Sequence, residues 1–219
     1  MKIICVPTGP LSTNTYVVIN DSAEKTAEGK TPCAVIDPAN SRKVLALLDE
    51  RGLACTDILL THGHFDHIMG VADIKARENA RVSVHEKDAS AVTGGNGCLA
   101  FMAGALVKHC EVDRLLHDED VITAAGMEFR VLHTPGHTPG GCCFVMEDER
   151  VLFSGDTLFR LSVGRTDLDG GSDEQLYESI AYRLFPLHGD YAVLPGHGEE
   201  TDLEFERQHN PFMKKGGMY

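Results

Sequence analysis

Residues 61–67, THGHFDH, place three histidines and one aspartate in seven positions, directly after an apolar run at residues 58–60. Imidazole nitrogens and carboxylate oxygens are ligands that zinc, iron and manganese accept in proteins. His62 and His64 are two residues apart on extended chain, so both side chains can point the same way. Asp66 and His67 lie at the start of the helix expected next, so their side chains point to a position beside the one that His62 and His64 face. This stretch therefore predicts ligands for two metal ions.

Three later stretches repeat the pattern of an apolar run that ends in a ligand-type side chain. They are HTPGH at residues 133–137, SGD at residues 154–156 and PGH at residues 195–197. Loops on a rigid scaffold often carry functional residues, so we expect these side chains to converge at one edge of the fold. We assign His62, His64 and His137 to the first metal, Asp66, His67 and His197 to the second, and Asp156 to both as a bridge.

The other histidines lack a ligand-type neighbour at useful spacing, and we expect ordinary polar residues in loops. They are His85, His109, His117, His188 and His209. His133 lies closer to the expected site, and two interpretations stay open for it: an ordinary loop residue, or a residue that orients a metal ligand.

Short apolar runs alternate with helical patterns, which indicates an α/β protein with mixed sheets flanked by helices. Strands are expected at residues 2–6, 15–20, 33–37, 57–60, 81–85, 127–133, 141–146, 150–154 and 191–194. Helices are expected at residues 41–51, 66–77, 98–108 and 173–184. Ser172 and Gln175 form a capping-box signal for the last helix. The charged turn at residues 147–150 favours an antiparallel hairpin between its two apolar neighbours.

The role of the segment 94–125 stays open at this stage. It begins with the glycine-rich stretch GGNG at residues 94–97, which interrupts the regular pattern. Two interpretations are equally compatible with this segment: a mobile loop that covers the site, or a surface loop without a role at the site.

Composition narrows the possible partners and location. A hydrophobic content of 42% and a charged content of 24% are ordinary for a soluble globular protein. The net charge of −13 argues against nucleic acid and anionic membrane as partners. The first residues lack signal-peptide features, and no run approaches eighteen apolar residues, so we expect a cytoplasmic protein. The oligomeric state stays open.

The cysteines do not indicate a disulfide framework or a Cys-based zinc site. There are seven, an odd number, and none forms a CxxC pair. We expect most of them to be reduced thiols in the core. Cys142 and Cys143 are adjacent on an expected strand, so they must point to opposite faces of the sheet.

The four motifs together resemble those of the metallo-β-lactamase superfamily. THGHFDH matches its THxHxDH signature, and HTPGHTPG, SGDTLF and PGHG match its later ligand motifs in order. The resemblance covers nearly the whole chain. It implies a four-layer αβ/βα sandwich, with two mixed sheets flanked by helices and the site at one edge. We therefore expect a single domain of this type over residues 1–219.

Within the superfamily the chain looks most like the glyoxalase II group, the hydroxyacylglutathione hydrolases, and particularly the short bacterial type. The likeness rests on Asp66, on Asp156 within GDTLF, and on VGRTD at residues 163–167. The motif pattern of the best-known β-lactamases of the superfamily has a cysteine near the bridging position, whereas this chain has Asp156 there. The resemblance therefore disfavours a β-lactam substrate. Arg160 and Arg165 are candidates to bind a substrate carboxylate, with surface salt bridges as the alternative.

The resemblance implies hydrolysis of a small-molecule thioester, an S-2-hydroxyacyl thiol similar to S-lactoylglutathione. Two divalent ions, zinc first and iron or manganese as alternatives, would supply hydroxide at neutral pH and polarise the carbonyl. Asp66 is the expected catalytic residue, because it can also hold the attacking hydroxide. A thiol has a pKa of about 8.5 and can leave without a separate acid. Alternatives are a mononuclear iron persulfide dioxygenase, a lactonase or phosphodiesterase, and a non-enzymatic metal-binding module.

Overall fold

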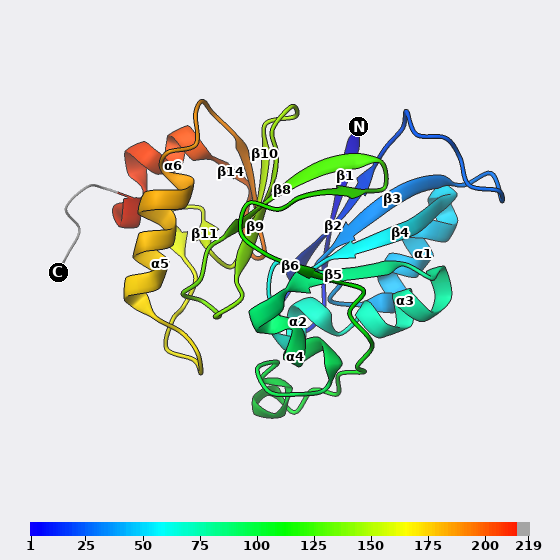
Figure 1. Cartoon of the computed structure of the whole chain (residues 1–219), viewed down its shortest axis with the longest axis horizontal. Helices are drawn as coiled ribbons and strands as arrows, with labels where there is room; N and C mark the ends of the chain where they lie inside the picture. Colours follow the sequence, from blue (N-terminus) through cyan, green and yellow to red (C-terminus); the bar gives the residue numbers. More distant parts are fainter. Residues whose placement is uncertain (214–219) are drawn as a thin grey trace.

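The computed structural model describes residues 1–213 and contains two β-sheets that lie side by side, with helices on their outer faces (Figure 1). The first sheet has the strand order β1-β2-β3-β4-β5-β6, and the second has the order β14-β13-β10-β9-β8-β7. The layers are helix, sheet, sheet and helix, so the predicted four-layer α/β sandwich is confirmed. In the described part of the chain, none of the helices combines the length and apolarity needed to cross a bilayer.

The first sheet is built from the N-terminal half of the chain. Its strands are β1 (Lys2–Thr8), β2 (Thr13–Ile19), β3 (Thr31–Ile36), β4 (Leu53–Leu59), β5 (Arg81–His85) and β6 (Arg114–Leu116). β1 to β3 pair antiparallel, and β3 to β6 pair parallel. Parallel neighbours need crossover connections, which here contain α1 (Ser41–Arg51), α2 (Phe65–Ile68), α3 (Val71–Glu78), η1 (Glu86–Asp88), α4 (Ala89–Thr93) and η2 (Ala100–Ala103).

The second sheet is built from the C-terminal half. Its strands are β7 (Val121–Ala124), β8 (Met127–His133), β9 (Cys142–Met146), β10 (Val151–Gly155), β13 (Ala192–Pro195) and β14 (Thr201–Asp202). β10 and β13 pair parallel and the other neighbours antiparallel, so β8, β10 and β13 end at the same edge. The remaining elements are β11 (Leu158–Phe159), β12 (Ser162–Val163), α5 (Asp173–Ser179), the π-helical η3 (Ile180–Leu184), α6 (Leu203–His209) and η4 (Pro211–Met213).

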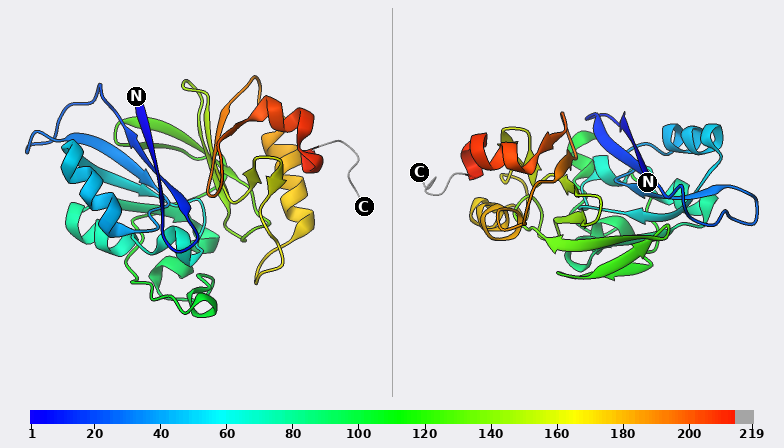
Figure 2. Two further views of the ribbon diagram at one scale, coloured as in Figure 1. Left: turned by 180° about the vertical axis from the view of Figure 1, so that it is seen from behind. Right: turned by 90° about the horizontal axis from the view of Figure 1, so that it is seen from above.

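Three apolar clusters join the four layers. One lies between the sheets and contains Phe129, Phe144 and Phe153. The second packs the first sheet against α1 and α3, and the third packs the second sheet against α5 and η3. Figure 2 shows α1 and α5 on opposite outer sides of the molecule. Cys142 belongs to the inter-sheet cluster and Cys143 to the third cluster, which confirms that adjacent strand residues point to opposite faces.

Most expected elements are present, and several bounds agree. The helix over residues 41–51 and the strands over residues 81–85 and 127–133 have the predicted limits. Ser172 caps α5 by accepting a hydrogen bond from the backbone N–H of Gln175 at 3.3 Å. β9 and β10 form the predicted hairpin. The short elements β6, β7, β14, α4 and α6 were not expected, because each is too short to show a clear hydrophobic period.

Two expected helices differ from the structure. The helix over residues 66–77 is divided at Gly70, whose N–H donates to the carbonyl of Pro38 at 2.7 Å. A Cβ at Gly70 would stand 2.5 Å from that same oxygen, so the close approach itself requires glycine. The helix expected over residues 98–108 is wrong, because only η2 forms there. Leu99 and Gly104 flank η2 with φ of 57° and 61°, in the left-handed region that ends a helix.

The predicted single domain extends over residues 1–219, and residues 214–219 lie outside the described part of the chain. This prediction of domain limits therefore stays a prediction.

Candidate metal centre

The four ligand motifs meet at the edge where the two sheets approach each other. β4 leads into residues 61–67, whereas β8, β10 and β13 lead into the other three motifs. The backbone N–H of Cys142 donates to the carbonyl of Thr61 at 2.8 Å, which ties the first motif to the second sheet. The N–H of Gly196 donates to the carbonyl of Gly155 at 2.8 Å and aligns the last two motifs. The expected convergence of the strand ends is therefore present.

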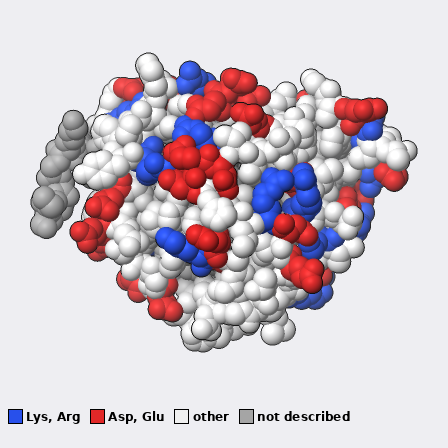
Figure 3. Space-filling view, in the orientation of Figure 1, with Lys and Arg blue, Asp and Glu red and all other residues white. Residues whose placement is uncertain are grey.

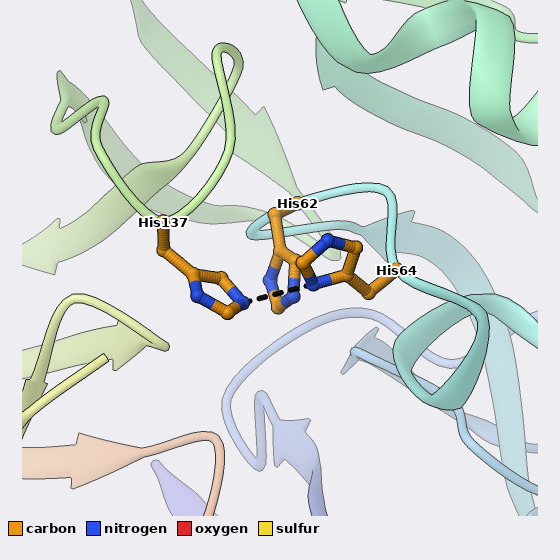
Figure 4. A group of neighbouring side chains, drawn as sticks. All are labelled: His62, His64 and His137. Atoms are coloured by element: carbon orange, nitrogen blue, oxygen red, sulfur yellow. Dashed lines mark hydrogen bonds between the residues drawn. The ribbon is translucent and has the colours of Figure 1, made fainter. Parts of the chain in front are cut away.

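His62, His64 and His137 form the first ligand group (Figure 4). Nδ1 of His64 lies 2.9 Å from Nε2 of His137, and the His62 ring lies edge-on to both other rings at centroid distances of 4.8 Å. All three side chains are buried. Burial, together with the neighbouring histidines, lowers the pKa of His64 to about 3 and the pKa of His62 well below its ordinary value. Both rings are thus neutral at pH 7 and offer a lone pair.

Asp66, His67 and His197 form the second ligand group. Nε2 of His197 lies 3.3 Å from Nε2 of His67 and 3.2 Å from Oδ2 of Asp66. Burial opposes a charge on His67, but the carboxylates of Asp156 and Asp37 outweigh burial and raise its pKa to about 9. Burial also opposes a charge on His197, and the hydrogen bond to Asp66 reverses that effect and raises its pKa. Protons and a metal ion therefore compete for this group.

Asp156 lies between the two groups, at the position predicted for the bridge. Its Oδ2 is 3.4 Å from Nε2 of His137 and 3.6 Å from Nε2 of His197, and its Oδ1 is 3.5 Å from Nε2 of His67. Its carboxylate can thus reach ions held by either group.

The donor set fits divalent metal ions. Buried polar atoms normally have partners, yet Nε2 of His62 and Oδ1 of Asp156 have no hydrogen-bond partner among the described residues. Tetrahedral ligands at roughly 2.0–2.1 Å from zinc are about 3.3 Å apart. The nitrogen separations of 2.9 and 3.3 Å within the two groups are close to this spacing.

Asp37 and Thr13 support the second group and were missed from the sequence. Oδ2 of Asp37 accepts a hydrogen bond from the Thr61 hydroxyl at 2.6 Å and contacts Nδ1 of His67 at 2.9 Å. This contact leaves Nε2 of His67 to face the site. The Thr13 hydroxyl donates to Oδ2 of Asp66 at 2.9 Å. Asp37 follows the apolar strand β3, so the pattern used for the ligands could have indicated it, whereas Thr13 carried no such signal.

Asp88 joins the two loops that carry the first group, and it was also missed. Its Oδ2 accepts hydrogen bonds from the Gly63 N–H at 2.9 Å and from the Thr138 hydroxyl at 2.7 Å. Its Oδ1 accepts one from the Gly140 N–H at 2.7 Å. A Cβ at Gly140 would stand 2.6 Å from Cγ of Asp88, so glycine permits this approach.

His133 and His85 form a stacked pair beside the site, with ring centroids 4.1 Å apart. Nε2 of His133 donates to the carbonyl of Pro139 at 2.9 Å, so His133 supports the loop that carries His137. Among the described residues, His133 hydrogen-bonds none of the candidate ligand side chains. His85 is buried at the end of strand β5, as the predicted strand over residues 81–85 requires, so it is not in a loop. It belongs to none of the candidate ligand groups among the described residues.

A cleft of about 580 Å³ opens over the two ligand groups. Arg165 lines the cleft, but its guanidinium is bound to both carboxylate oxygens of Asp167 at 2.7 and 2.8 Å. Arg160 is not among the described residues that line this cleft, and it pairs with Glu199. Leu99 and Met102 also line the cleft, so the segment 94–125 reaches the site.

The four-layer sandwich and its two histidine and aspartate groups define a metal-binding enzyme scaffold. A family model described as the metallo-beta-lactamase superfamily matches residues 8–197. The chain therefore belongs to this superfamily, as its four motifs predicted.

Similar proteins match almost the full length of the chain. It is 34% identical over 218 residues to the probable metallo-hydrolase YqgX of Bacillus subtilis, covering 97% of this chain and 98% of that protein. It is 30% identical over 227 residues to the hydroxyacylglutathione hydrolase GloC of Haemophilus influenzae, covering 97% and 98%. The solved structure of the BLEG-1 B3 metallo-beta-lactamase has a TM-score of 0.88 at 35% identity, covering 97% and 100%. That of TTHA1623 in a di-iron-bound form has a TM-score of 0.81 at 37% identity, covering 95% and 99%.

Proposed function

We propose that this protein hydrolyses a small-molecule thioester of the S-2-hydroxyacyl type and holds two divalent ions in its two ligand groups. The observation that carries the proposal is the position of Asp156, whose oxygens lie 3.4 to 3.6 Å from histidine nitrogens of both groups. The similarity to GloC supports the acyl-thiol substrate. Zinc is the first candidate ion; iron, which a related structure holds, and manganese are alternatives.

Bound ions would supply a water that loses its proton near neutral pH and would polarise the substrate carbonyl. Asp66 is the residue of this chain that we assign to orient the attacking water. Burial favours its neutral form, but the hydrogen bond with His197 and the charge of His67 outweigh burial and lower the pKa of Asp66. Its carboxylate is therefore anionic at pH 7 and lines the cleft. It can accept a hydrogen bond from the water while Thr13 fixes its orientation.

The leaving group also favours a thioester. A thiol of pKa about 8.5 departs as the thiolate, whereas an amine must be protonated as it leaves. The net charge of −13 supports a small molecule rather than nucleic acid or an anionic membrane as the partner.

The test is steady-state hydrolysis of S-D-lactoylglutathione by protein purified with its metals, together with elemental analysis. We expect about two ions per chain and a kcat/KM above about 10⁴ M⁻¹s⁻¹, which is ordinary for an enzyme on its own substrate. Asp156→Asn should lose both metal and activity, whereas Asp169→Asn, at an exposed position, should lose neither. Full metal content without turnover of any thioester would overturn the proposal. Oxygen consumption by iron-loaded protein that depends on an added persulfide would instead support the persulfide dioxygenase alternative.

Asp156 disfavours a β-lactam substrate by comparison of the motifs, but the similarity to BLEG-1 makes β-lactam hydrolysis the second candidate. An amide in a strained ring is open to the same metal-assisted attack by water. A chromogenic cephalosporin assayed beside the thioester separates the two candidates. A kcat/KM for the cephalosporin above that for every thioester tested would assign the β-lactam reaction.

A further inference from the structure

The walls of the cleft over the metal centre are apolar, although its floor consists of ligands. Of the fourteen described residues that line the cleft, five are proposed metal ligands and seven are apolar. The apolar residues come from separate parts of the chain. Leu11 lies between β1 and β2, Leu99 and Met102 lie in and beside η2, and Phe159 and Val163 lie in β11 and β12.

These walls leave apolar surface in contact with water. Leu11 is 56% exposed and Met102 is 62% exposed. Single exposed apolar side chains are common on soluble proteins, but here several surround one reaction centre. In Figure 3 the lower part of the molecule, where Figure 1 places α4 and the chain after it, shows few charged residues. A ligand that covers this surface gains binding free energy in proportion to the apolar area removed from water.

The cleft offers little to a highly charged substrate. Arg165 is the one lysine or arginine among the described lining residues, and Asp167 already binds its guanidinium through two oxygens. A substrate carboxylate would have to compete with this bidentate pair. The two carboxylates of glutathione therefore find no unpaired cation in the lining.

We propose that the natural substrate carries an apolar arm next to its scissile carbonyl, and that the arm lies against Leu11, Met102 and the other apolar wall residues. The arm belongs either to the acyl group or to the thiol, and both sources present the same hydrocarbon to the wall. This inference rests on the proposed thioester hydrolysis and narrows its substrate class.

Two substrate series distinguish the sources of the arm. The first varies the acyl group from acetyl to octanoyl on N-acetylcysteamine. The second keeps the lactoyl group and varies the thiol from ethanethiol to hexanethiol, with glutathione as the charged reference. In one series we expect kcat/KM to rise about threefold to fourfold for each added methylene until the wall is covered. Values that change less than twofold across both series would overturn the inference.

Variants of the wall test whether these residues cause the increase. Met102→Ser and Leu11→Ser should flatten the dependence of kcat/KM on chain length, so that the ratio of long-chain to short-chain activity falls in both variants. Leu106→Ser is the matched control, because Leu106 follows η2 and is 93% exposed but does not line the cleft. An equal slope in the wild type and both wall variants would contradict the role of the wall.

A binding measurement separates failure of this inference from failure of the proposed reaction. Calorimetric titration of the metal-loaded protein with carboxylates from acetate to octanoate measures how the affinity depends on contact with the apolar wall, and it requires no turnover. Affinity that rises with chain length in the wild type and Leu106→Ser, but not in Met102→Ser, supports the apolar arm even if no thioester is cleaved. If S-lactoylglutathione is hydrolysed but neither kcat/KM nor the affinity for carboxylates changes with chain length, the proposed thioester hydrolysis stands and the apolar arm is refuted.

Discussion

Replacement of Asp88 by alanine should loosen both loops that carry the first ligand group. The change leaves the backbone N–H groups of Gly63 and Gly140 without an acceptor. A buried donor without a partner costs about 1–3 kcal/mol, so the two together lower the free energy of unfolding by about 2–6 kcal/mol. The Thr138 hydroxyl adds less, because it can rotate toward another acceptor.

The conservative variant Asp88→Asn should be less harmful. Its amide oxygen can still accept from Gly63 and Thr138, whereas its NH₂ group then faces the Gly140 N–H. One backbone donor, the Gly140 N–H, is left unpaired in place of two, so we expect a loss of about 1–3 kcal/mol.

Urea unfolding of the metal-free protein measures these losses, and competition with a chromophoric chelator measures metal affinity. Loss of residues that support ligands typically weakens metal binding or activity about 10–100-fold, and we expect a loss of this size for Asp88→Ala. The control is Asp148→Ala in the exposed turn between β9 and β10, which should change stability by less than about 0.5 kcal/mol. If Asp88→Ala unfolds like this control and binds metal like the wild type, Asp88 does not hold the loops.

Four further predictions concern the centre and its surroundings. Asp66→Ala should reduce turnover on the order of 10²–10⁴-fold with an unchanged circular dichroism spectrum, and near-wild-type turnover at full metal loading would contradict the two-metal assignment. Gly196→Ala should reduce bound metal from about two ions per chain to about one in elemental analysis, because its Cβ would stand 2.3 Å from Oδ1 of Asp156 and 2.8 Å from Cε1 of His67. Metal loading at pH 7 should release protons, since the pKa of His67 is about 9 without a metal; identical calorimetric heats in buffers of different ionisation enthalpy would refute this. Burial and the neighbouring His133 lower the pKa of His85 to about 4, so the unfolded chain takes up this proton first, near pH 6.5. The contribution of His85 to stability should therefore be full above pH 6.5 and fall by about 1–3 kcal/mol toward pH 4, so that urea titrations show a smaller fall over this range for His85→Gln.

The local part of the metal centre was readable from the sequence. His62, His64, Asp66 and His67 lie within one turn of chain, so their spacing alone brings their side chains near one another. The strand ends that carry His137, Asp156 and His197 were also predictable, because each follows an apolar run long enough to form a buried strand.

The supporting residues and the cleft walls depended on contacts between distant parts of the chain. Asp88 is 25 residues from Gly63 and 52 residues from Gly140, and these hydrogen bonds exist only because both sheets end at the same edge. The apolar residues 98–108 predicted a helix by their composition, whereas the backbone at Leu99 and Gly104 adopts left-handed conformations that stop it.

The sequence by itself thus determined the superfamily, and it predicted the candidate ligands and the strands that carry them, since these depend on neighbouring residues and on hydrophobic period. Only the tertiary structure decided which carboxylates hold the loops, which arginines face the cleft and which apolar side chains surround it. Arg165 lines the cleft and Arg160 does not, although both follow the same motif. The physical reason is that hydrogen-bond partners and exposed faces are set by the packing of the two sheets, which no local pattern encodes.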